Sequence, residues 1–463
     1  MQRFRFVLLI LAALLSGAPA AAQTAAAAPA AAVAPTPADR SLTLCWAAWD
    51  PADALVNLSK EFTTQTGVRM RYLFVPWTGF AYRMLKELSS KSDVCDLMIG
   101  DSQWMGTAAT AGHYVELTDF FAKNGIDMKD FMPATVEGYS TWPKGSKHYW
   151  ALPAMGDAVA WTYRKDWFAR PDLRREFKNK YGRDLDPPDT WEELKEVAQF
   201  FQGREIDGKK VYGAAIYTER ASEGITMGVT SAMYAWGMQY DNPAKPYDMG
   251  GFINSEGAVQ GLKFYRELFD CCTPPEHFLA YMSENLNAYR SGRVAMQMNF
   301  IAFFPGIAKH PAVGGDKTGF FVMPRAKERA AQLGGQGISV VAYSPKRDLA
   351  LQYIKWFAQP AVQTKWWELG GFSTHVAVTG APGFADSTPY ARVYLDSMRV
   401  VRDFWQEPVY EKLLGAMQVR VHDYVVAGRG TPQAALDKLL QDWTDIFKQD
   451  GKSSTAVAGR LSQ

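Results

Sequence analysis

The sequence predicts an α/β protein in which parallel strands are flanked by helices. Strands and helices alternate along residues 42–112, which is the order of a parallel sheet. Hydrophobic residues make up 48% of the 463 residues, enough for large cores. We find no repeat of 20–50 residues, and the chain is too long for a single sheet. These observations favour more than one α/β unit.

The N-terminal elements carry the clearest pattern. Apolar runs at 42–50, 68–77 and 95–100 are typical of strands, and 51–67, 81–91 and 102–112 are typical of helices. Pro51 suits a first helical turn and Gly67 a helix end. The resulting β-α-β-α-β order predicts neighbouring parallel strands.

Later helices are recognised by their start signals. Thr190 and Glu193 form a predicted capping box, and Thr431 with Pro432 starts another helix. Strands are expected between such helices at 211–217, 294–299, 319–324 and 338–343. The α/β alternation therefore continues through the chain.

Both ends of the sequence are expected to lie outside the folded part. Residues 1–22 have the basic, apolar and small-residue regions of a secretory signal peptide. Residues 23–40 are rich in Ala and Pro and predict a flexible tether, and 451–463 predict a flexible tail. No Cys follows the apolar run, so we expect export to the periplasm without a lipid anchor.

The four cysteines predict no zinc module. Cys45 lies late in one predicted strand and Cys95 begins another, so the two can bridge if those strands are neighbours. Cys271 and Cys272 are adjacent, and either form a vicinal disulfide or stay reduced.

Standard catalytic signatures are missing from the sequence. It has no phosphate-binding Gly-rich loop, no His-Glu-x-x-His and no Gly-x-Ser-x-Gly, and its six His are scattered. We expect no catalytic residue, metal or cofactor, although a glycosidase pair of carboxylates stays open. A net charge of +2 without a basic stripe argues against nucleic acid.

Two strands end in the same kind of side chains. The first strand ends in Trp49 and Asp50, and Asp101, Gln103 and Trp104 follow the third. Ligands of open α/β sheets bind outside the carboxyl ends of the strands. A hydrogen-bonding group beside an aromatic face suits a sugar or polyol, which has both polar and apolar surfaces.

Six segments in order resemble the periplasmic solute-binding proteins of ABC importers, in the carbohydrate-binding family that includes the maltose-binding proteins. The segments span about residues 41–447: "CDLMIGDSQWMGTAATAGHYVELTDFF", "YWALPAMGDAVAWTYRKDWF", "PDTWEELKEVAQFF", "FINSEGAVQGLKFYRELF", "AYRSGRVAMQMNF" and "GGQGISVVAYSPKRDLALQYIKWFAQPAVQTKWWELGGF".

The resemblance implies the two-lobed periplasmic-binding-protein fold of type II, with a mainly parallel sheet in each lobe. Lobe one would hold 41–152 and 325–360, and lobe two 153–324 and 361–450. The segments 151–155 and 321–326 match the family's hinge strands, which allow closure around a solute. The family's sheet order also implies that Cys45 and Cys95 are bridged.

The resemblance also implies the contact residues. In lobe one they are Trp49, Asp50, Trp77, Asp101, Gln103 and Trp104, with Trp104 as a stacking face. Elsewhere they are Asp157 as an acidic ligand, Asn299, Phe300, Gln336 and His375. Gln336 stands where many relatives have Trp, and His375 where an Arg is common.

The function implied is capture of a sugar, oligosaccharide or polyol, or a sugar phosphate, for delivery to the membrane permease subunits of an ABC importer. We expect a monomer. Two other classes stay open: a secreted carbohydrate-active enzyme, and a periplasmic interaction protein built on the same fold.

Overall fold

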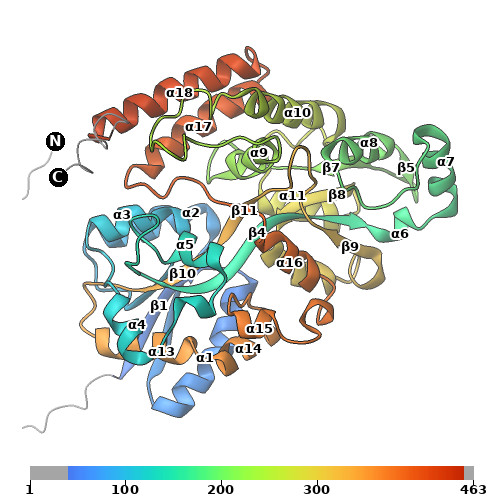
Figure 1. Ribbon diagram of the computed structural model, residues 1–463. Coiled ribbons are helices and arrows are strands. Elements are labelled where there is room, and N and C mark those ends of the chain that lie inside the picture. The colour runs from blue at the N-terminus through green and yellow to red at the C-terminus, as the bar shows by residue number, and fades with distance from the viewer. Residues whose placement is uncertain (1–39, 453–463) are drawn as a thin grey trace, which may run out of the picture. The chain divides into compact units, whose positions relative to one another are not determined.

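The centre of the fold is a nine-stranded sheet, seen in a computed structural model that describes residues 40–452 (Figure 1). Its strand order is β2-β1-β3-β10-β4-β8-β7, with β11 beside β10 and β9 beside β4. The strands are β1 (Ser41–Ala47), β2 (Arg69–Val75), β3 (Leu97–Asp101), β4 (Leu152–Arg164), β7 (Tyr212–Ala215), β8 (Val294–Phe300), β9 (Thr318–Phe321), β10 (Ala331–Val340) and β11 (Val401–Arg402). Strands β5 (Glu205–Ile206) and β6 (Lys209–Lys210) form a separate pair.

Helices surround this sheet. Those of the first half are α1 (Asp50–Thr66), α2 (Trp77–Ser89), α3 (Met105–Thr110), α4 (Thr118–Asn124), α5 (Pro133–Tyr139), α6 (Lys165–Phe168), α7 (Pro171–Tyr181), α8 (Trp191–Phe201) and α9 (Gly224–Ala235). Those of the second half are α10 (Glu256–Cys272), α11 (Met282–Arg290), α12 (Phe304–Ala308), α13 (Arg347–Phe357), α14 (Pro360–Glu368), α15 (Val376–Thr379), α16 (Ala391–Met398), α17 (Tyr410–Val425) and α18 (Pro432–Gln449). Within residues 40–452, no helix is long and apolar enough to cross a membrane.

The predicted β-α-β-α-β start of the chain is confirmed. Strand β1 pairs in parallel with both β2 and β3. Helix α1 has Pro51 in its first turn and ends at Gly67, whose φ of 70° is left-handed and suits glycine. The predicted signal peptide and most of the tether and tail lie outside the described residues.

The expectation of a mainly parallel sheet in each lobe is wrong for the second part. Strand β4 pairs antiparallel with β8 and β9, and only β7 with β8 is parallel there. Strand β10 is also antiparallel to β3 and β4. The direction changes because β4 and β10 run between the two groups of strands instead of belonging to one βα unit.

Two long strands connect the two groups. Strand β4 pairs with β10 over Leu152–Ala158 and then with β8 from Val159 onward. The predicted hinge segment 151–155 therefore lies at the start of β4. The second predicted segment, 321–326, contains only the end of β9, and β10 is the strand that spans both groups. The lobe boundaries drawn from the sequence stay a prediction.

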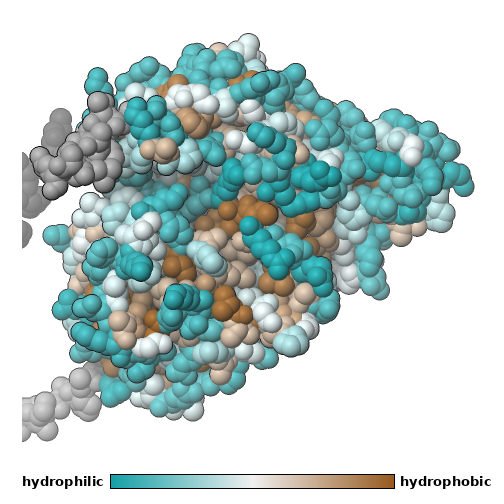
Figure 2. Space-filling view, viewed as in Figure 1, coloured by the Kyte–Doolittle hydropathy of each residue, from teal (hydrophilic) through white to brown (hydrophobic). Residues whose placement is uncertain are grey.

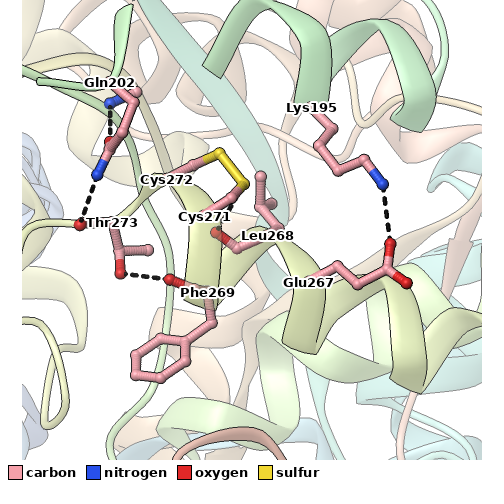
Figure 3. Close-up of a disulfide and its surroundings, with 9 residues drawn as sticks. Lys195, Gln202, Glu267, Leu268, Phe269, Cys271, Cys272 and Thr273 are labelled. Carbon is pink, nitrogen blue, oxygen red and sulfur yellow. Dashed lines mark hydrogen bonds and ion pairs between the residues drawn. A yellow bond between two sulfur atoms is a disulfide. The ribbon is translucent and has the colours of Figure 1, made fainter. Parts of the chain in front are cut away.

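Both cysteine pairs are bonded. Cys45 in β1 and Cys95, just before β3, form a disulfide with Cα atoms 5.8 Å apart. Cys271 and Cys272 are bonded to each other at the end of α10 (Figure 3). The described part of the chain has no free cysteine.

Helices gather at the two ends of the view, with the sheet between them. Figure 1 shows α1, α13 and α14 at one end, and α10, α17 and α18 at the other. Figure 2 shows apolar side chains in the middle of the same face, where β4 and β10 run in Figure 1, and hydrophilic residues around them. The middle of the sheet is thus where side chains from both groups of strands meet.

Candidate functional site

A cavity lies at the carboxyl ends of β1, β2, β3 and β8. The atom-free space inside it, which includes the part continuous with solvent, is about 380 Å³. Its lining comes from turns after these strands, from β4 and β10, and from the starts of α9 and α11. The lining residues are Trp49, Trp77, Asp101, Gln103, Asp157, Glu223, Met227, Tyr281, Met282, Phe300, Leu333, Gly334, Gly335 and Gln336.

Two tryptophans form the wall next to α1 and α2. The ring of Trp49 lies 5.0 Å from that of Trp77 and 5.5 Å from that of Trp46, edge to face in both cases. This packing holds the two indoles in fixed orientations. Both Nε1 atoms are buried and have no hydrogen-bond partner in the protein. The wall therefore offers apolar faces and two free donors.

Two glutamines add polar groups from β3 and β10. Gln103 is 2% exposed, and its Oε1 has no partner. Gln336 accepts a hydrogen bond from Trp46 Nε1 through Oε1, which leaves its Nε2 unpaired. The pairing of β10 with β4 is irregular directly after Gln336, as at a β-bulge. Such an irregularity re-aims a side chain and is common beside functional sites.

Asp157 lies on β4 and is 1% exposed. Its Oδ1 accepts hydrogen bonds from the backbone N–H of Ala158 at 2.8 Å and of Ala302 at 3.1 Å. Burial raises the pKa of this carboxyl to about 8, although these N–H groups act to lower it. Asp157 is therefore held firmly in place and can exchange a proton near neutral pH.

Asp101 and Glu223 bring two more carboxyl groups to the cavity. Burial, together with the charge of Asp403, raises the pKa of Asp101 to about 7. Burial, followed by the charges of Asp101 and Asp403, raises the pKa of Glu223 well above its usual value. Asp403 lines the groove that adjoins this cavity, and burial raises its pKa to about 6. The acidic groups of this region disfavour one another's ionisation.

Two glycines of β10 allow its backbone to lie close to the ring of Phe300. A Cβ on Gly334 would lie 2.6 Å from the ring of Phe300, and Gly335 has a φ of +89°. Larger residues would clash at the first position and be strained at the second. The ring of Phe300 therefore rests against bare backbone and faces the cavity.

Seven of the residues expected from the sequence line this cavity together. They are Trp49, Trp77, Asp101, Gln103, Asp157, Phe300 and Gln336. Their shared position is a finding about geometry, and their contact with a ligand stays a prediction.

The expected stacking role of Trp104 does not fit its position. Trp104 is 1% exposed, its ring packs 5.2 Å from that of Phe80, and it does not line the cavity. The chain forms a tight 3₁₀ turn over Ser102–Trp104, directly after β3. Within this turn Gln103 reaches the cavity wall, whereas Trp104 packs into the core.

Three other expected contacts also lie elsewhere. Asn299 is buried and holds the wall, since it donates to Met282 O and accepts from Tyr217 Oη and the Phe300 N–H. His375 caps α15 by accepting from the Ala377 N–H, and packs on Phe131. Asp50 is exposed in the first turn of α1, where a carboxylate favours the helix dipole.

The sequence did not single out the other half of the lining. Glu223 and Met227 come from the start of α9, Tyr281 and Met282 from the start of α11, and Leu333 from β10. None of them follows a predicted strand or belongs to a known motif. Only the folded chain, which brings distant segments together, shows that they belong to the cavity. Glu223 has a φ of 70°, rare for a residue with a side chain, but backbone angles cannot be read from sequence.

A larger groove adjoins the cavity at Leu333. Its atom-free space is about 2120 Å³, again including open solvent. Aromatic residues Trp142, Tyr240, Tyr247 and Trp405 line it beside both acidic and basic side chains.

No group of three His, Cys, Asp or Glu side chains within residues 40–452 is placed to hold a metal ion. The arrangement can bind a small polar molecule through hydrogen bonds and aromatic contacts.

Comparison with known proteins places the chain in a family. The sequence model for bacterial extracellular solute-binding proteins matches residues 57–389. A probable amino-acid ABC transporter periplasmic-binding protein of Sinorhizobium fredii is 22% identical over 437 residues, which is 90% of each chain.

Solved structures are similar in fold. A solute-binding protein of an ABC transporter from Thermotoga lettingae TMO, bound with α-D-tagatose, has a TM-score of 0.74 and 20% identity, over 88% of this chain and 99% of that one. Another, from Agrobacterium radiobacter K84 in complex with ribitol, has a TM-score of 0.71 and 23% identity, over 88% and 98%. The fold is thus that of the two-lobed periplasmic solute-binding proteins.

Proposed function

Because the chain belongs to the family of bacterial extracellular solute-binding proteins, we propose that it binds a small hydroxylated solute, a sugar or polyol, in the cavity at the strand ends. It then delivers this solute to the permease subunits of an ABC importer. It acts as an exported protein and causes no chemical change in the solute.

One observation carries this proposal. Four residues that line one cavity each have a buried polar atom without a partner: Nε1 of Trp49 and Trp77, Oε1 of Gln103 and Nε2 of Gln336. A buried polar group without a hydrogen bond costs free energy, about 1–3 kcal/mol each. A solute with several hydroxyl groups pairs such donors and acceptors at once, while its C–H faces pack on the indoles.

The proposal agrees in ligand type with similar folds. The proteins from Thermotoga lettingae and Agrobacterium radiobacter were solved with tagatose and ribitol, and another from Agrobacterium vitis S4 with D-mannitol. These ligands are hydroxylated molecules of five or six carbons.

Titration calorimetry of the purified mature protein with D-tagatose, ribitol and D-mannitol tests the proposal. We expect saturable binding of at least one compound, and unchanged ligand when the mixture is analysed by chromatography after long incubation. Conversion of the ligand would instead favour the carbohydrate-active enzyme, and no binding of any sugar or polyol would favour the interaction protein.

A pair of variants on α2 locates the site. Trp77→Ala removes a wall of the cavity and should weaken binding by about 1–3 kcal/mol. Tyr82→Ala on the same helix is the matched control, because the Tyr82 side chain is 74% exposed and does not line the cavity. Equal affinity of both variants would place the site elsewhere.

A further inference from the structure

The cavity is lined by acidic side chains and by no basic ones. Asp101, Asp157 and Glu223 contribute three carboxyl groups, and none of the lining residues is Lys, Arg or His. Within residues 40–452 none of these three carboxyl groups is in an ion pair. Neutral solutes need acceptors for their hydroxyl groups, but they do not need three acids in one small cavity.

The other groups of the cavity also suit a positive charge. Gln103 Oε1 is a buried acceptor without a partner, on a side chain that is 2% exposed. The aromatic residues Trp49, Trp77, Tyr281 and Phe300 line the same space, and the faces of aromatic rings attract cations. An ammonium group has three donors and no acceptor, so it matches carboxyl and amide oxygens together.

A metal ion is a poorer match for this cavity. No three acidic, His or Cys side chains of the described residues are placed to hold one. Indole faces and indole N–H donors are also not metal ligands, whereas they suit an organic cation with hydroxyl groups.

We propose that the solute carries a protonated amine on a hydroxylated carbon skeleton, as in an amino sugar or an amino polyol. This inference rests on the proposed function and specifies the class of its ligand. The amine is held by the carboxyl groups of Asp101 and Glu223 and by Gln103 Oε1, and the hydroxyl groups pair with the indole and Gln336 donors.

The proposal gives affinity a defined pH dependence. Asp101 interacts with the charges of Asp403 and Glu223 and with the phenol groups of Tyr114, Tyr281 and Tyr410. Asp157 interacts with the phenol groups of Tyr139, Tyr217 and Tyr394. The charge of Lys144 acts on Asp403. The empty site therefore holds protons near neutral pH. A cation favours ionised carboxylates, so it releases protons when it binds, and it binds more tightly as the pH rises over the range in which its own amine stays protonated.

Matched probe pairs test this by calorimetry at pH 5.5, 6.5 and 7.5, in two buffers with different ionisation enthalpies. One pair is D-glucosamine and D-glucose, with N-acetyl-D-glucosamine as an uncharged analogue. The other is 1-amino-1-deoxy-D-sorbitol and D-sorbitol. We expect the amine of at least one pair to bind ten times more tightly than its neutral partner at pH 7.5, to release protons, and to lose this advantage at pH 5.5.

Two other outcomes separate this inference from the proposed function. Neutral members that bind as tightly as the amines, with affinity independent of pH, would overturn the inference and leave the proposed function standing. Putrescine is an amine without hydroxyl groups. Binding of putrescine with no sugar or polyol bound would overturn both the proposed hydroxylated solute and the inference as stated, as would no binding of any probe.

A charge-removing variant addresses the residues themselves. Glu223→Gln keeps the shape of the side chain and removes its charge, so it should reduce the preference for the amine over its neutral partner at least fivefold. Glu219→Gln is the control, since Glu219 is four residues away and does not line the cavity. A preference unchanged in Glu223→Gln, with a native melting temperature, contradicts the role given to this carboxyl.

Discussion

Trp46 in β1 donates a hydrogen bond from its indole Nε1 to the side-chain oxygen of Gln336 in β10, 290 residues later in the sequence. Both side chains are buried, so the bond connects two strands inside the core, while Gln336 Nε2 has no partner and Gln336 lines the cavity. One residue thus belongs both to the core of the fold and to the lining of the site.

We expect Gln336→Leu to lower the free energy of unfolding by about 1–3 kcal/mol, because Trp46 Nε1 would be buried without a partner. Trp46→Phe removes the other half of the bond, and the double variant should recover about 0.5–1.5 kcal/mol relative to additivity. Urea unfolding of the four proteins measures this coupling. Strictly additive losses would show that the bond contributes nothing of its own.

Trp104 should behave as a core residue. Trp104→Ala leaves a large void beside Phe80, and such truncations cost about 3–5 kcal/mol of stability. Its folded fraction should still bind ligand, whereas Trp77→Ala should lose affinity with a much smaller loss of stability. Urea unfolding and calorimetry on both variants decide the assignment. A Trp104→Ala protein with parental stability but lost binding would restore the stacking role.

Some of the expected residues that line the cavity were found from strand ends alone, whereas Asp157, Phe300 and Gln336 lie within strands and were expected from the family resemblance. Trp49, Asp101 and Gln103 lie at the carboxyl ends of β1 and β3, and strand periodicity located those ends. The error between Gln103 and Trp104 arises one residue later, because a 3₁₀ turn sends successive side chains in different directions.

The residues that could not be foreseen come from segments that meet only in the folded chain. Glu223 and Tyr281 start helices far from the strand ends in sequence, and no local pattern connects either of them to Asp101. Asn299 and His375 have polar side chains suited to a ligand, but backbone groups use them instead. The residue type alone does not show whether a polar side chain forms hydrogen bonds with backbone groups of the protein or is left to bind a solute.

The Cys45–Cys95 disulfide should stabilise the fold more than the Cys271–Cys272 disulfide. The first closes a loop of 50 residues and constrains the unfolded chain by about 4 kcal/mol in the loop-entropy account, whereas the second joins neighbours and closes almost no loop. Urea unfolding of Cys45→Ala/Cys95→Ala and of Cys271→Ala/Cys272→Ala compares them. Equal losses in the two double variants would argue that loop closure is not the source of the stability.

Asp157 should make the unliganded protein less stable as the pH rises. Its pKa is about 8 in the folded protein, against 3.8 as the ordinary value, so between about pH 4 and 8 the folded state holds a proton that the unfolded state releases. Stability contributed by this proton is present below the lower value and is lost as the pH rises through the window.

Asp157→Asn removes this titration and keeps an oxygen for the N–H groups of Ala158 and Ala302. Relative to the parent, its free energy of unfolding should therefore increase by about 1–3 kcal/mol from pH 5 to pH 9, measured by urea unfolding without ligand. Asp157→Ala is the control for the hydrogen bonds, because it leaves both N–H groups unpaired and should be less stable than Asp157→Asn at each pH. A parent and an Asp157→Asn protein that lose stability in parallel would mean that another group, such as Asp101, governs the pH dependence.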